Sequence, residues 1–456
     1  MYASFLPYIE LWLNTIRVKG FAIPDLYGQV SEVEPDHSCF DEVMKEFIDR
    51  MQGNYPFHQP EYAGQMLKPP HPFAWLAYTL AMTINPNNHA LDGGPPSSEM
   101  EKEVISWIAE MVGYSTGYLG HLTSGGTVAN LEALWVARSL HPDKMVICSE
   151  DAHYTHHRMA QVLGMKCESV PVDHSGKMIL SRLEEKLKNT GTLIVTMGTT
   201  GRGLVDTLHK YIPLCKKFGV RIHVDAAYGG FFKIISDELL NTDDWNCLHQ
   251  ADSIVIDPHK HGLQPYGCGC VLFKDASVGR FYKHDSPYTY FSSSDLHLGE
   301  ISLECSRAGA SAAALWFTLK VMGLNKASDL GKTLLKCVQA AKSFSANIHK
   351  SQNFNLLSEP ETDIICYYPI AQSTNEISRS SNKIFQFGMN QSDKPFYVSL
   401  FKINSDLLQA LHPDIHINTP TTTILRSVFM KPSHHAFTDE LMERLHKAYS
   451  AISEGQ

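Results

Sequence analysis

The stretch Ser253–Gly269, "SIVIDPHKHGLQPYGCG", joins a short apolar run to a group of charged side chains. The run Ile254–Ile256 has the β-branched residues of a buried parallel strand, and it stops abruptly at Asp257. Four further apolar runs, "KMVICS", "LIVTMG", "VRIHV" and "CGCVLF", lie between residues 144 and 273, and segments with a helical pattern, such as "TVANLEALWVARSL", lie between or before them. This alternation predicts an α/β fold around a mainly parallel sheet, with all five runs as buried parallel strands.

Polar side chains follow four of these predicted strands. His153 comes after the first strand, Thr199 and Thr200 follow the second, Asp225 follows the third, and Lys260 follows the run Ile254–Ile256. Ligands of an open parallel sheet bind at the carboxyl ends of its strands. We therefore expect these side chains to meet in one site.

The stretch "LTSGGTVANL" predicts an anion-binding turn at the start of a helix. Ser124, Gly125 and Gly126 lead into a helix that begins near Thr127, and free N–H groups at such a start suit a phosphate. A tight turn before an ordinary capped helix explains the same residues equally well. No Gly-Lys-Ser/Thr follows, and "GTTGRG" lacks the dinucleotide-binding spacing, so neither a P-loop nor a Rossmann dehydrogenase is expected.

These groups together match the needs of pyridoxal 5'-phosphate (PLP). The cofactor has a phosphate, a ring on which His153 can stack, and a pyridine nitrogen that a carboxylate such as Asp225 keeps protonated. Its aldehyde forms a Schiff base with a lysine amine, here that of Lys260. The residues thus indicate a PLP enzyme.

Composition excludes several other classes of protein. The net charge is −9 over 456 residues and no basic cluster is interleaved with aromatic residues, so a nucleic-acid partner is not expected. No apolar stretch approaches the ~20 residues that cross a bilayer, and the first residues lack the features of a signal peptide. The ten cysteines show no regular framework, and the nearest pair, Cys268 and Cys270, lacks the CxxC spacing. We expect a soluble, cytoplasmic protein without a metal site.

The motifs also resemble a known family. The stretches "NPNNHALDGGPPSSEMEKEV", "TSGGTVANL", "AHYTHH", "GTTGRGLVD", "HVDAAYGG", "DPHK" and "ECSRAGASAAALW" occur in the order and at the spacing of the group II PLP-dependent amino-acid decarboxylases. The resemblance runs from about Asn85 to Trp316 and continues more weakly to the C-terminus. "DPHKHGLQPYGCG" is similar to the bacterial and archaeal tyrosine/aspartate decarboxylase branch.

This resemblance implies the fold and the domain organisation. We expect the fold type I of PLP-dependent transferases, which is similar to aspartate aminotransferase, with a mainly parallel central sheet in a large domain and a smaller C-terminal α+β domain. The expected parts are an N-terminal arm (1–84) that packs on a partner subunit, a PLP-binding domain (85–325) and a small domain (326–456). A homodimer with shared active sites follows from the same resemblance.

The resemblance also implies roles for individual residues. Lys260 would hold the cofactor, Asp225 would pair with the pyridinium and His153 would stack on the ring. The remaining cofactor contacts would come from Ser124, Gly125, Gly126, Thr127 and His259 at the phosphate, from Thr199 or Thr200 at the phenolic oxygen or ring edge, and from Ala227 under the ring. Arg426 in "TILRSVFMKP" is a candidate for the substrate carboxylate, with a surface salt bridge as the alternative, and His89 belongs to a loop expected to line the substrate pocket.

The expected reaction is decarboxylation of an L-amino acid to its amine, with an aromatic substrate such as tyrosine favoured and aspartate open. Tyr266, six residues after Lys260, is one candidate proton donor, and Tyr288 and Tyr290 in "HDSPYTYFSSSD" are others. Phe291 leaves open a decarboxylating aldehyde synthase. A carbon–carbon lyase of the sphingosine-phosphate-lyase type is the other alternative, whereas an aminotransferase or an inactive scaffold is disfavoured.

Overall fold

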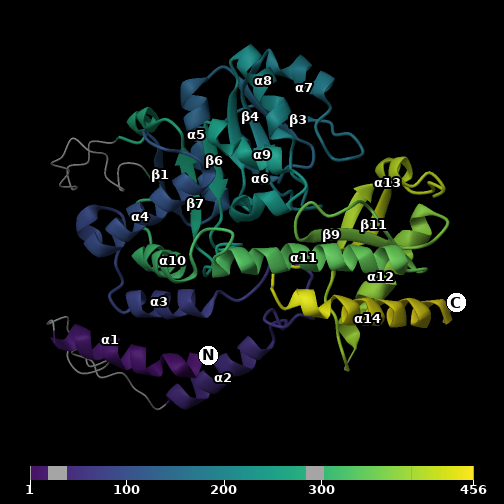
Figure 1. Ribbon diagram of the computed structural model, residues 1–456, viewed down its shortest axis with the longest axis horizontal. Helices are drawn as coiled ribbons and strands as arrows, with labels where there is room; N and C mark the ends of the chain where they lie inside the picture. Colours follow the sequence, from purple (N-terminus) through teal and green to yellow (C-terminus); the bar gives the residue numbers. More distant parts are fainter. Residues whose placement is uncertain (1, 19–38, 284–301, 392, 455–456) are drawn as a thin grey trace.

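The computed structural model describes residues 2–18, 39–283, 302–391 and 393–454. Two sheets organise this part of the chain, and a long helix, α11 (Asp329–Lys350), runs alongside both in Figure 1. The larger sheet comes from residues 119–273 and the smaller one from residues 354–428. An α/β fold with a mainly parallel central sheet is confirmed. The predicted domain boundaries stay a prediction.

The larger sheet has seven strands in the order β1-β7-β6-β5-β4-β2-β3. Neighbours from β6 to β3 pair in parallel, whereas β7 runs antiparallel to both β1 and β6. The prediction that "CGCVLF" forms a parallel strand is therefore wrong. The strands are β1 (Leu119–Thr123), β2 (Met145–Ser149), β3 (Cys167–Val170), β4 (Thr190–Thr196), β5 (Arg221–Asp225), β6 (Ser253–Ile256) and β7 (Gly269–Phe273).

Both faces of this sheet are buried, which explains why its strands lack polar alternation. In β6, Ile254 and Ile256 join the core on one face, and Val255 joins the core under α5 on the other. Helices cover both faces, as Figure 1 shows. They include α4 (Pro95–Val112), α5 (Gly126–Leu140), α6 (Thr155–Val162), α7 (Leu180–Leu187), α8 (Leu208–Phe218), α9 (Thr242–Asn246) and α10 (Gly309–Met322).

The smaller sheet is antiparallel, with four strands in the order β10-β11-β9-β8. Ser373 and Glu376 form a capping box that starts α12, and Ser328 caps α11 by accepting from Gly331 N. The elements of this part are β8 (Phe354–Leu356), β9 (Ile364–Pro369), α12 (Thr374–Asn390), β10 (Ser399–Asn404), α13 (Ser405–Leu411), β11 (Thr421–Val428) and α14 (His434–Glu454).

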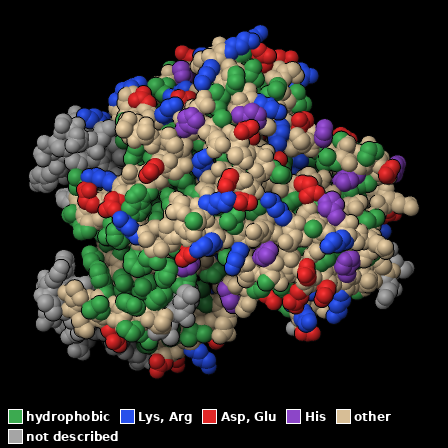
Figure 2. Space-filling view, in the orientation of Figure 1, with side chains coloured by type: hydrophobic (Ala, Val, Ile, Leu, Met, Phe, Trp, Pro, Cys, Tyr) green, Lys and Arg blue, Asp and Glu red, His purple; other side chains and the backbone are tan. Residues whose placement is uncertain are grey.

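The N-terminal helices lie below the larger sheet in Figure 1. They are α1 (Leu6–Val18), α2 (Phe40–Gln52) and α3 (Pro72–Met82). Helix α3 packs on α10, whereas α2 has no buried residue and exposes an apolar stripe. Figure 2 shows apolar side chains gathered at the lower left, in the region of the N-terminal helices. Within the described ranges, no helix has the length and apolar character that crossing a bilayer requires.

Candidate active site

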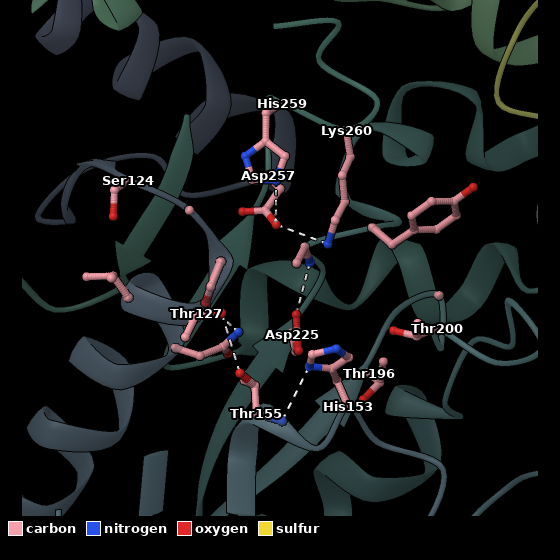
Figure 3. A pocket seen from close by; sticks show the side chains of 17 residues that line it. Ser124, Thr127, His153, Thr155, Thr196, Thr200, Asp225, Asp257, His259 and Lys260 are labelled. Atoms are coloured by element: carbon pink, nitrogen blue, oxygen red, sulfur yellow. Dashed lines mark hydrogen bonds and ion pairs between the residues drawn. The ribbon is translucent and has the colours of Figure 1, made fainter. Parts of the chain in front are cut away.

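A cavity of about 340 Å³ opens at the carboxyl ends of β4, β5 and β6, beside the start of α5 (Figure 3). Its size falls within the range of ordinary small-molecule pockets. The structure brings together almost every residue that the sequence predicts for the cofactor. Those that line the cavity are Ser124, Gly125, Gly126, Thr127, His153, Thr200, Asp225, Ala227, His259 and Lys260.

Asp225, the last residue of β5, is buried at one wall of the cavity. Its Oδ1 accepts a hydrogen bond from Ala227 N at 3.0 Å, and its Oδ2 lies 2.9 Å from Nε2 of the buried His156. Burial alone would raise the pKa of this carboxyl, but His156, Lys260 and the Ala227 N–H together bring it well below its usual value. Asp225 is therefore a fixed negative charge inside the cavity.

Lys260 reaches the cavity from the turn that follows β6. Its Nζ lies 3.0 Å from Oδ2 of Asp257, and the same oxygen is 3.5 Å from His259 Nε2. His259 Nδ1 lies 2.8 Å from the carbonyl oxygen of Cys268, so this nitrogen carries the hydrogen and donates it. The turn thus orients an amine, an imidazole and a carboxylate toward one another (Figure 3).

His153 lies across the cavity from Lys260 and close to Asp225 (Figure 3). The backbone N–H of Thr155 donates to His153 Nδ1 at 3.3 Å, so the ring carries its hydrogen on Nε2. Burial lowers the pKa of His153, which favours this neutral form. A neutral, half-buried imidazole at this wall suits contact with a flat ring.

The start of α5 provides an uncapped set of N–H groups. Gly125 has φ +153° and precedes the helix, and no side chain of the described residues caps it. A Cβ on Gly126 would lie only 2.6 Å from Asp257 Oδ2, so this position has no room for a side chain. The N–H of Ser124 is already used, because it donates to Glu304 Oε2 at 2.8 Å. The N–H groups of the first helical turn remain for an anion.

Two buried side chains hold this helix start against β5. His223 Nε2 lies 2.8 Å from Asn130 Oδ1, and Asn130 Nδ2 donates to Gly126 O at 2.8 Å. The other ring nitrogen of His223 is 2.9 Å from Ser253 Oγ. Burial lowers the pKa of His223 to about 3, so the ring is neutral in the folded protein.

An adjoining cavity of about 480 Å³ shares His153 and Thr200 with the first. Arg426, on β11 of the smaller sheet, lines it and is buried. Its guanidinium donates to Gly201 O, Gly64 O, Ser399 Oγ and Thr200 O. No carboxylate of the described residues forms an ion pair with Arg426, so the alternative of a surface salt bridge is wrong.

Some predicted residues do not reach the first cavity. Thr199 Oγ1 accepts from Leu204 N at 3.0 Å and lines the adjoining cavity instead. Tyr266 packs on His259 with ring centres 5.2 Å apart, but its hydroxyl donates to Met66 O at 3.0 Å. His89 packs beside Gly93 and lines neither cavity. Tyr288, Tyr290 and Phe291 lie outside the described residues.

The sequence assigned no role to three residues that shape the site. His156 contacts Asp225, Asp257 contacts Lys260, and Asn130 supports the start of α5. A signal existed for two of them: Asp257 directly follows a predicted strand, and His156 lies three residues after His153, one helical turn further along. Asn130 carried no such signal.

The donor set of the cavity fits PLP. An ionised buried carboxylate can hold a proton on the pyridine nitrogen, a lysine amine faces the same space, and uncapped N–H groups can bind the phosphate. Both glycines at the start of α5, Gly125 and Gly126, line the cavity, so their backbone is open to it.

Comparisons with known proteins agree with this assignment of the cofactor. A family model described as the pyridoxal-dependent decarboxylase conserved domain matches residues 50–369. The L-aspartate decarboxylase of Thermococcus kodakarensis is 29% identical over 72% of this chain and 84% of its own length. The probable L-tyrosine/L-aspartate decarboxylase of Methanothermobacter thermautotrophicus is 28% identical over 69% of this chain and 85% of its own.

Solved structures share the fold. Oryza sativa TDC, crystallised with PLP and tryptamine, superposes with a TM-score of 0.79 at 17% identity and covers 98% of both chains. At such low identity the likeness concerns the fold alone.

Proposed function

The chain belongs to the pyridoxal-dependent decarboxylase family and is a PLP-dependent amino-acid decarboxylase, and we propose that its substrate is an L-amino acid with a carboxylate side chain, with aspartate as the first candidate. The sequence favours an aromatic substrate, whereas Arg426 in the adjoining cavity favours an acidic one. The observation that carries the proposal is Arg426, a buried cation in that cavity without an anionic partner among the described residues.

We assign the residues of the first cavity to holding the cofactor. PLP, once bound, supplies an electron sink for the electron pair that stays on Cα when CO2 leaves. Lys260 anchors it through Nζ, the ionised carboxylate of Asp225 keeps a proton on the pyridine nitrogen, and the first turn of α5 binds the phosphate. His153 packs on the ring and keeps water from that face.

One N–H of Arg426 is available to a substrate. A guanidinium has five N–H groups, and the four bonds from Arg426 use one on Nε, two on Nη1 and one on Nη2. The fifth N–H, on Nη2, has no partner among the described residues. Because the charge is buried and pairs only with neutral oxygens, a carboxylate that enters this cavity gains a strong charge-assisted bond.

This carboxylate is better assigned to the side chain of the substrate than to its α-carboxylate. The α-carboxylate loses its charge as CO2 leaves, so an arginine bound to it stabilises the reactant more than the transition state and slows the reaction. A side-chain carboxylate keeps its charge throughout. Arg426 bound there improves binding and orientation without raising the barrier.

Release of CO2 from a panel of L-amino acids tests the proposal. We expect aspartate to be decarboxylated, and we expect Arg426→Lys to raise KM for aspartate about tenfold or more, because the three N–H groups of a lysine cannot replace the four bonds to the protein and also bind the substrate. Arg202→Lys is the matched control, because Arg202 lines the same cavity but already pairs with Asp151 at 2.5 Å. Release of CO2 from tyrosine and not from aspartate, or equal effects of the two variants, would contradict the proposal.

Tyrosine is the second candidate, because the ring of Phe401 also lines the adjoining cavity. The same panel separates the other reactions. An aldehyde together with hydrogen peroxide would identify a decarboxylating aldehyde synthase, and cleavage of amino-alcohol phosphates without CO2 would identify a carbon–carbon lyase. For the proton donor we favour Tyr288 or Tyr290 over Tyr266, since the hydroxyl of Tyr266 already donates to a backbone carbonyl.

A further inference from the structure

Three potential metal ligands meet at the edge of the larger sheet, away from the cavity. They are Cys148 on β2, Cys167 on the edge strand β3 and His157 on α6. The two Sγ atoms and one imidazole nitrogen lie within 4.8 Å of one another, and no other such group of three occurs in the described ranges. Both cysteines are free thiols in the structure.

The strand register places these ligands on one face of the sheet. Cys148 pairs with Ser169, and Cys167 pairs with Val146. Cys167 and Ser169 are two residues apart on β3, so their side chains point to the same face of the sheet. Cys148 belongs to the small core under α6, and Cys167 packs against that core. His157 approaches from the helix, and its exposure leaves a path from solvent.

We propose that Cys148, His157 and Cys167 form a Zn²⁺ site, with Ser169 Oγ or a water as the fourth ligand. His157 Nε2 lies 3.7 Å from Cys148 Sγ. Two ligands of one tetrahedral zinc, a sulfur and a nitrogen, are about 3.5 Å apart, given Zn–S and Zn–N bonds of ~2.3 and ~2.0 Å. Ser169 Oγ lies 3.0 Å from the same nitrogen, so an oxygen already stands beside the site.

The donor set selects among metals. Two thiolates and an imidazole favour a thiophilic ion such as Zn²⁺ over Mg²⁺ or Ca²⁺, which prefer oxygen ligands. A disulfide between Cys148 and Cys167 would not explain why His157 and Ser169 lie beside the two sulfurs. Cys148 and Cys167 are also offset by two residues along the paired strands, and the imidazole nitrogen lies within 4.8 Å of both sulfurs.

Zinc at this position would tie α6 to the edge of the sheet. His156, the residue before His157, contacts Asp225 in the cofactor cavity. Fixing α6 therefore also fixes a partner of Asp225. The metal site stands on its own geometry and does not depend on the proposed substrate.

Metal analysis of the full-length, tag-free protein tests the site. We expect about one zinc per chain after purification without chelator. Cys167→Ala and His157→Ala should each lose most of it, whereas Cys247→Ala should keep it, because Cys247 is a free, partly exposed cysteine outside the group. Replacement by Co²⁺ should give the visible d–d bands of a tetrahedral thiolate site, and these bands should be absent from His157→Ala.

Thermal unfolding gives a readout that is independent of activity. Added Zn²⁺ should raise the unfolding temperature of the chelator-treated wild-type protein and of Cys247→Ala, but not of Cys167→Ala, because only a folded-state ligand shifts the equilibrium. Three results would overturn the proposal: substoichiometric zinc with no thermal shift, equal zinc in all variants, or a Cys148–Cys167 disulfide in anaerobically purified protein.

Discussion

Asp225 shows how single residues determine the chemistry of the site. Its carboxylate is buried, which by itself disfavours the charge, yet His156, Lys260 and the N–H of Ala227 keep it ionised. A cofactor with a protonated ring nitrogen needs this charge at this point. The two flanking contacts hold both carboxylate oxygens, so the position of the charge is fixed as well.

Asp225→Asn removes the charge and keeps the shape. We expect kcat/KM for CO2 release to fall about 10²- to 10³-fold, corresponding to ~3–4 kcal/mol for a buried charge that loses its partner. His156→Gln keeps the carboxylate and should cost only about tenfold, the size of one hydrogen bond to a charged group. Steady-state kinetics with circular dichroism as the folding control separate the two variants. Activity of Asp225→Asn within twofold of wild type would exclude the assigned role.

For single residues, the sequence identifies the side chains that follow strands but not the side chains that hold these in position. Lys260 and His153 follow a strand, Asp225 is the last residue of one, and all three line the cavity. His156 and Asn130 act through tertiary contacts to other side chains, which no local pattern encodes. Tyr266 is near Lys260 in sequence, but a carbonyl oxygen 200 residues away decides where its hydroxyl points.

Among the elements, β5 carries a histidine that links stability to pH. His223 is fully enclosed between Ser253 and Asn130, and burial lowers its pKa to about 3. In the unfolded chain the pKa of a histidine is about 6.5. Below that value the unfolded state binds a proton that the folded state does not. The contribution of His223 to stability is therefore fully present above pH ~6.5 and is lost progressively as the pH falls toward ~3.

Replacement of this histidine should reduce the pH dependence of unfolding. Between pH 6 and pH 5 we expect the free energy of unfolding of the wild type to fall by about 1 kcal/mol more than that of His223→Gln. Urea denaturation at each pH measures the difference, and glutamine retains groups that can bond Asn130 and Ser253. Parallel pH profiles for the two proteins would show that His223 titrates normally in the folded state.

The strands illustrate which features of an element a sequence encodes. Apolar runs predicted β2, β4, β5, β6 and β7, because a strand buried on both faces needs no polar alternation. They could not reveal the direction of β7, which is apolar for the same reason. A parallel connection needs a crossover, usually through a helix, and the short link from Asp257 to Cys268 contains no helix. This short link was the feature of the sequence that indicated an antiparallel strand.

In the whole molecule, buried polar contacts join the two sheets around the site. His261, to which the sequence assigned no role, lies with Nε2 3.2 Å from Asp363 Oδ2, just before β9. Tyr228, which lines the cofactor cavity, donates to Asp363 Oδ1 at 2.6 Å. Arg426 adds bonds from β11 to Thr200 and Gly201. The smaller sheet is thereby held against the wall of the cavity.

Helix α2 supports the proposal of a homodimer. Six apolar side chains are exposed on it at helical spacing, namely Phe40, Val43, Met44, Phe47, Ile48 and Met51. An exposed apolar stripe of this kind marks a protein–protein contact, and we propose that a second copy of the chain packs against it. Val43→Glu with Phe47→Glu should convert a dimer to a monomer in sedimentation experiments, whereas Glu42→Lys, a charge change in the first turn of the same helix, should not. A wild-type monomer, or a double variant that still dimerises, would contradict the proposal.

Borohydride reduction followed by peptide mass spectrometry tests whether Lys260 is the residue that holds PLP. Two other lysines are the competing candidates, because burial lowers the pKa of Lys68 to about 8 and that of Lys431 to about 7, which favours the neutral, reactive amine. Neither of these lysines lines the cavity. We expect a reduced pyridoxyl group on the peptide that contains Lys260, and none in Lys260→Ala. A pyridoxyl group on Lys68 or Lys431, or an unchanged label in Lys260→Ala, would contradict this assignment.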